Sequence, residues 1–258
     1  MIALIRAEWT KLRTVDGPAW LLVGAVALTV ALSITVVTAV TCREAGCPGD
    51  PTRLSLTGVQ LGQAVVAIVA VLAVGGEYST GLIQTTLAAA PRRERVLVAK
   101  AVTVAVPVLV AGTLAVLGCL LAGWLVLPGR GFTAAHGQPP VSLAHAATVR
   151  AAVGSVLYLA LIALLSLGVA AVVRDTAAAI GLVLSLLYLS PILIHVINSE
   201  HWRLRFERWA PGSAGLSVQA TTGLHSLSIG PWRGLGVLAL WAAGALLAGA
   251  FTLRVRDA

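Results

Sequence analysis

Long apolar stretches alternate with short polar ones along the chain, and six of the apolar stretches run for about 20 residues or more without a central charged side chain. Lipid offers no partner for backbone amides, so each stretch is expected to become a helix that satisfies its own hydrogen bonds. A hydrocarbon core about 30 Å thick needs about 20 helical residues. The pattern therefore predicts an all-α membrane protein with six transmembrane helices, at residues 18–41, 57–76, 96–127, 151–173, 177–197 and 234–253.

The third stretch is longer than a membrane requires. As one straight helix its 32 residues would extend about 48 Å. We expect it to tilt, to bend near Pro107 or to project into the interface. Lys100 lies close to its start, where a long aliphatic stem can carry the ammonium group back to water.

Composition and charge agree with a membrane protein. The 258 residues are 58% hydrophobic and 11% charged, against about 45–50% and about 25% in soluble domains. This leaves no room for a large aqueous domain. The surplus of 18 basic over 10 acidic residues is interpreted as charge at the membrane surface, and nucleic-acid binding is not expected. With six helices both termini lie on one side, and the basic residues divide ten to eight in favour of cytoplasmic termini.

The chain has no motif of an enzyme or of an ion-coupled carrier. A phosphate-binding P-loop needs a lysine after glycine, but neither Lys11 nor Lys100 follows one. The histidines form no His-Glu-x-x-His motif, and no Gly-x-Ser-x-Gly elbow occurs. No ionisable group occupies the middle of an apolar stretch, where a driving ion would bind. Any energy for transport is therefore expected from another chain, and no catalytic residue, metal ligand or cofactor site is predicted.

Residues 1–15 have the pattern of a helix lying in the membrane interface. Apolar side chains recur every three or four positions, and basic and polar ones occupy another face. The alternative is an ordinary cationic flank without fixed structure. The apolar positions are Ile2, Ile5, Trp9 and Leu12, and the polar ones are Arg6, Thr10 and Arg13.

The segment at 77–95, between the second and third stretches, is too short and too polar to cross the membrane. Ser79 or Thr80 can cap a short helix, and Pro91 disfavours its continuation. Such a helix would offer Leu82, Ile83 and Leu87 to a partner at the membrane surface. A plain connecting loop is the alternative.

Two other polar segments carry candidate features. Cys42 and Cys47 bracket four residues of the first loop and could form a disulfide, or they could be two free thiols. In the last long loop, Trp202, Phe206 and Trp209 recur at helical spacing among charged residues. This pattern favours a second surface helix at the level of the lipid headgroups.

Three stretches resemble the membrane permease subunits of type-two ABC exporters, particularly the short actinobacterial permeases linked to antibiotic or peptide export. Residues 7–14, with Glu8, Trp9, Lys11 and Arg13, look like the family's amphipathic elbow. Residues 76–87, followed by Pro91 to Arg93 and by Ala99 and Lys100, are similar to its cytoplasmic coupling segment. Residues 208–215 look like the Leu-Pro-x-x-Ala-Gly element before the last span, with Ala210 in place of the usual leucine.

The resemblance implies an architecture and a set of partners. Both termini would be cytoplasmic in a bacterial cell membrane, two permease copies would pair, and a separate ABC ATPase would bind ATP and Mg and supply the energy. The cargo would be lipophilic or amphipathic. A non-transporting immunity or regulatory subunit that uses the same surface helices is the alternative. The residues that would contact the ATPase or fix the coupling junction are Glu77, Tyr78, Ser79, Thr80, Gly81, Leu82, Ile83, Leu87, Arg92 and Arg93.

Overall fold

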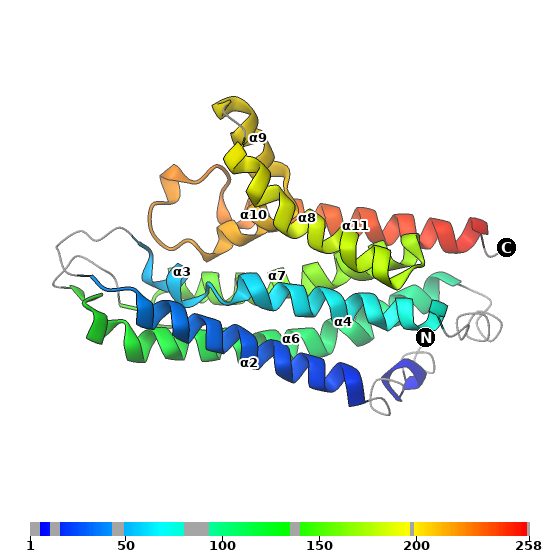
Figure 1. Cartoon of the computed structure of the whole chain (residues 1–258), viewed down its shortest axis with the longest axis horizontal. Coiled ribbons are helices and arrows are strands. Elements are labelled where there is room, and N and C mark those ends of the chain that lie inside the picture. Colours follow the sequence, from blue (N-terminus) through cyan, green and yellow to red (C-terminus); the bar gives the residue numbers. More distant parts are fainter. Residues whose placement is uncertain are drawn as a thin grey trace.

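The computed structural model describes residues 6–10, 16–42, 49–79, 93–134, 140–196 and 199–256. Over these ranges the chain is helical and contains no β-strand (Figure 1). Six helices are long and apolar enough to cross a membrane, which confirms the predicted fold class. They are α2 (Asp16–Ala39), α4 (Val59–Ser79), α6 (Arg93–Val126), α7 (Ala146–Val173), α8 (Thr176–Val196) and α11 (Pro231–Arg256).

Several helix boundaries differ from those predicted by apolar length. The helix α6 runs without a break through Pro107. The helix α7 begins before Arg150, which the sequence pattern left outside, because the guanidinium of this residue donates a 2.7 Å hydrogen bond to the carbonyl of Ala220. Tertiary pairing thus lets charged and polar residues extend the helices beyond their apolar parts.

Short helices fill the connections. They are α3 (Pro51–Ser55), α9 (Glu200–Trp209), α10 (Pro211–Leu216), and the 3-10 turns η1 (Pro128–Arg130), η3 (Ser217–Gln219) and η4 (Leu224–Ser226). The helix α9 is the predicted second surface helix, and its Trp202, Phe206 and Trp209 are exposed.

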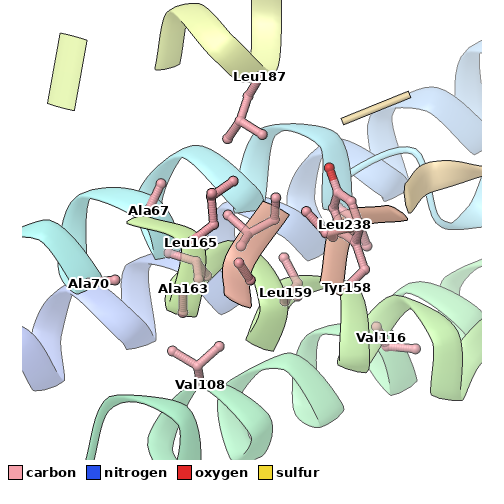
Figure 2. Packing of buried hydrophobic residues seen from close by; sticks show 14 of the residues in the cluster. Ala67, Ala70, Val108, Val116, Tyr158, Leu159, Ala163, Leu165, Leu187 and Leu238 are labelled. Atoms are coloured by element: carbon pink, nitrogen blue, oxygen red, sulfur yellow. The ribbon is translucent and has the colours of Figure 1, made fainter. Parts of the chain in front are cut away.

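The helix α7 forms the centre of the bundle. It packs against α4, α6 and α11, and Tyr158, Leu159 and Leu165 on it lie among side chains of the other helices (Figure 2). Its contact with α11 is close because both helices carry glycine there. A Cβ on Gly168 would lie 2.6 Å from backbone atoms of Ala245 and Leu246. Such small residues let transmembrane helices approach when lipid supplies no hydrophobic drive.

Different segments of the chain meet at the two ends of the bundle (Figure 1). The helical segment at 6–10, the end of α4, the start of α6, the α7–α8 turn and the end of α11 gather at one end, which we call the terminus end. The short helices α3, α9 and α10 lie at the opposite end, which we call the loop end. Both ends carry polar contacts between segments that are distant in sequence.

Candidate functional site: a buried charge cluster at the terminus end

Three ionisable side chains meet inside the terminus end. The ammonium nitrogen of Lys100 lies 2.9 Å from Oε2 of Glu8 and 2.7 Å from Oε1 of Glu77. It also lies 3.4 Å from the carbonyl oxygen of Ala73, one turn earlier on α4 than Glu77. We call Glu8, Lys100 and Glu77 the charge cluster.

The cluster is withdrawn from solvent. Lys100 is 3% exposed, Glu8 6% and Glu77 9%. The prediction that the Lys100 ammonium reaches back to water is therefore wrong, because two carboxylates supply the polar partners that water would have supplied. Removing one partner of a buried ion pair leaves an uncompensated charge, which costs about 3–5 kcal/mol.

Each member comes from a different part of the chain. Glu77 lies in the last turn of α4, Lys100 lies in the second turn of α6, and Glu8 belongs to the helical segment at 6–10. The predicted interfacial helix thus has an inward-facing residue that its apolar pattern did not reveal. Trp9, the neighbour of Glu8, is 39% exposed, as expected of an interfacial anchor. An acidic residue inside an otherwise basic and apolar segment was the available signal.

A second set of contacts lies beside the cluster. The guanidinium of Arg174 is 5.6 Å from the ring centroid of Tyr78 and donates a 3.0 Å hydrogen bond to the carbonyl of Thr252. Tyr78 follows Glu77 in α4, and Thr252 lies near the end of α11. The α7–α8 turn is thereby tied to two other helix ends.

The other predicted coupling and elbow residues are placed only in part. Glu77, Tyr78 and Ser79 belong to the end of α4, and Arg93 begins α6. The two ends of the 77–95 segment are therefore helical continuations of the spans. The rest lie outside the described residues, namely Thr80, Gly81, Leu82, Ile83, Leu87 and Arg92 of the segment and Lys11 and Arg13 of the elbow.

The cysteines differ in state. Cys42 is disulfide-bonded, and its predicted partner Cys47 lies outside the described residues. Cys119 is a buried free thiol that accepts a 3.1 Å hydrogen bond from the hydroxyl of Ser33, so it packs between α6 and α2. Within the described ranges no three His, Cys, Asp or Glu side chains gather in a way that could hold a metal ion.

A carboxylate organises the loop end. Asp50 caps α3 by accepting hydrogen bonds from the backbone amides of Thr52 and Arg53, at 3.1 and 3.2 Å. The same carboxylate accepts hydrogen bonds from the amide and hydroxyl of Thr221 and from the amide of Thr222. It therefore joins the first loop to the segment before α11, a link that no pattern in the sequence indicates.

These features define an all-helical protein of the multi-pass membrane class, with a buried charge cluster at one end. Comparison with protein-family models and with curated proteins finds no match for this chain.

Proposed function

We propose that this chain is the permease subunit of an ABC exporter, acting as a dimer with a separate ATPase that binds ATP and Mg. The observation that carries the proposal is the charge cluster. Glu77 and Lys100 flank the segment expected to contact the ATPase, and Glu8 attaches the expected elbow to both. The termini, and with them the terminus end, would face the cytoplasm.

The proposed role requires that force from the ATPase reach the spans. A rigid-body displacement of the ATPase acts on the coupling segment, and it can move the bundle only if the segment's ends are rigidly joined to the spans. Here both ends continue as helix, α4 up to Ser79 and α6 from Arg93. A salt bridge between the two helices makes them respond as one unit, and the elbow moves with them.

The lining of one cavity supports the proposed cargo class. An apolar cavity of about 530 Å³ lies between α7, α8 and α11, with Leu165, Leu186 and Trp241 in its lining. Volumes of this size fit small-molecule ligands. Its apolar lining favours a lipophilic or amphipathic cargo over an ion or a sugar.

Assembly with the ATPase can be tested through the coupling segment. The double variant Leu82→Asp with Leu87→Asp should abolish co-purification with the proposed partner ATPase, because aspartate cannot enter an apolar groove without loss of hydration. The matched control carries Leu143→Asp and Leu224→Asp, two exposed leucines at the loop end. Unchanged co-purification of the first variant would count against the proposal.

Coupling is tested by removing the cluster without leaving a buried charge. The triple variant Glu8→Gln, Lys100→Met and Glu77→Gln should still bind the ATPase, and ATP hydrolysis should continue in vesicles while ATP-dependent efflux of a lipophilic dye is lost. Efflux at the wild-type rate would contradict the assigned role of the cluster. A wild-type complex that hydrolyses ATP but moves no cargo would instead favour the regulatory subunit.

A further inference from the structure

A second cavity, of about 590 Å³, lies at the loop end and differs from the apolar one in its lining. It is bounded by α3, the start of α4, the end of α8, and the segment from α9 to η4. Its polar side chains come from most of these elements. They include Arg53, Gln60, Gln63, Tyr188, Glu207 and Ser217.

Two opposite charges border this cavity without engaging each other. Arg53 is exposed and Glu207 is half-buried. Among the described residues, neither the guanidinium of Arg53 nor the carboxylate of Glu207 has a hydrogen bond or ion pair. Their backbones are nonetheless fixed, because the Arg53 amide is bound by Asp50 and the Glu207 carbonyl accepts a 3.1 Å hydrogen bond from Ser213. The cavity is thus bordered by one cationic and one anionic side chain, each on a backbone that a hydrogen bond holds in place.

The wall along α4 is polar and ordered. Gln63 is 2% exposed, and its amide oxygen accepts a hydrogen bond from the Tyr158 hydroxyl. The Tyr188 hydroxyl donates to the carbonyl of Gln60. Such a network holds its polar groups in fixed positions before any ligand arrives.

The rest of the lining is apolar. Leu187 and Ile192 on α8, with Leu216 at the end of α10, complete the cavity beside the charged pair. A ligand that matches both parts must carry separated opposite charges and an apolar chain.

The expected depth of the cavity in the membrane also favours an amphiphilic ligand. The neighbouring helix α9 exposes Trp202 and Trp209, at 53% and 67%. Tryptophan side chains with such exposure favour the headgroup layer of a bilayer. The cavity therefore lies where the polar heads of amphiphiles gather.

We propose that this cavity binds a zwitterionic amphiphile, with its anionic group at Arg53, its ammonium group at Glu207 and its chain against Leu187 and Ile192. The occupant has this chemistry whether it is a membrane lipid or an exported compound. Binding requires only the folded chain, so the inference stands independently of the ATPase and of transport.

Native mass spectrometry of the full-length protein in detergent tests this binding. The probes are dihexanoyl phosphatidylethanolamine, Nε-dodecanoyl-lysine and, as an anionic comparison, dihexanoyl phosphatidylglycerol. At least one of the two zwitterions should bind with an apparent dissociation constant at least tenfold below that of phosphatidylglycerol, since an unpaired carboxylate opposes an anion. Binding of the phosphatidylethanolamine alone identifies a lipid occupant, and binding of the acyl-lysine alone identifies an exported type of amphiphile. Both outcomes support the proposal.

Variants assign the two charges. Arg53→Gln should weaken phosphatidylethanolamine binding about tenfold or more, and Glu207→Gln should abolish the discrimination against phosphatidylglycerol. Arg203→Gln, at an exposed arginine of α9 outside the cavity lining, should leave both affinities unchanged. Each variant is first shown to melt at the wild-type temperature. Equal binding of all three probes to the wild type, or unchanged affinities in both cavity variants, would overturn the proposal.

Discussion

Lys100 and Glu77 form a salt bridge of 2.7 Å between α6 and α4, and both side chains are buried. The same ammonium group binds Glu8 at 2.9 Å. One cation is therefore shared by two carboxylates, and it holds the N-terminal helical segment against two spans. The lysine therefore links three segments of the terminus end.

Replacing Lys100 should destabilise the protein strongly. Lys100→Met keeps an unbranched side chain that is one atom shorter, but it removes the cation that two buried carboxylates share, at a cost of about 3–5 kcal/mol. We expect a lower melting temperature in detergent, measured by intrinsic fluorescence. Arg95→Met, at an exposed basic residue of the same helix, is the control and should change the melting temperature little.

A second variant distinguishes loss of charge from loss of packing as the cause of the instability of Lys100→Met. If loss of the cation is responsible, adding Glu8→Gln and Glu77→Gln to Lys100→Met should restore most of the lost stability. A triple variant as unstable as Lys100→Met alone would mean that packing, not charge, determines the effect.

Close packing of α11 gives a second prediction. A Cβ on Gly234 would lie 2.0 Å from the carbonyl oxygen of Ala214, whereas a Cβ on Gly236 would meet nothing within 4 Å. Gly234→Ala should therefore cost about 1–3 kcal/mol, because the backbone of α10 must move. Gly236→Ala should be neutral or stabilising, since alanine favours a helix over glycine. Thermal unfolding of the two variants compares the same substitution two residues apart, and equal melting temperatures would contradict the close contact.

The transmembrane helices were predictable because lipid imposes a length and forbids unsatisfied backbone. This constraint acts on each segment separately, so apolar length alone locates α2 or α8. The charge cluster was not predictable in this way. From its position alone, a lysine near the start of a span can either reach water or form a buried ion pair. Only the tertiary approach of Glu8 and Glu77 decides between these two arrangements. The cap and cross-link formed by Asp50 likewise depend on Thr221, far away in sequence.

Asp50 should be the most sensitive residue of the loop end. Asp50→Ala removes the cap of α3 and the hydrogen bonds to Thr221 and Thr222 together. Loss of a cap alone costs about 1 kcal/mol, and the lost hydrogen bonds to Thr221 and Thr222 add to this. We expect faster hydrogen exchange of the Thr221 and Thr222 amides and a lower melting temperature. Thr57→Ala, which removes a hydroxyl bonded only to the Arg53 carbonyl within its own turn, is the control. Unchanged exchange in Asp50→Ala would contradict the cross-link.

Arg174 combines a strained backbone with a structural side chain, and two substitutions separate these contributions. Its φ of 62° is in the left-handed region, where it ends α7. A side chain there costs about 1 kcal/mol relative to glycine. Its guanidinium meanwhile contacts the Tyr78 ring and the Thr252 carbonyl.

Both Arg174→Ala and Arg174→Gly lose the guanidinium contacts, but only the glycine variant also relieves the backbone strain. We therefore expect both variants to be less stable than the wild type, with the glycine variant about 1 kcal/mol more stable than the alanine variant. Thermal unfolding in detergent measures the order. If the glycine variant unfolds at the lower temperature, strain of the left-handed backbone does not determine the difference in stability between the two variants. If both variants have the melting temperature of the wild type, the guanidinium contacts with α4 and α11 do not stabilise the protein.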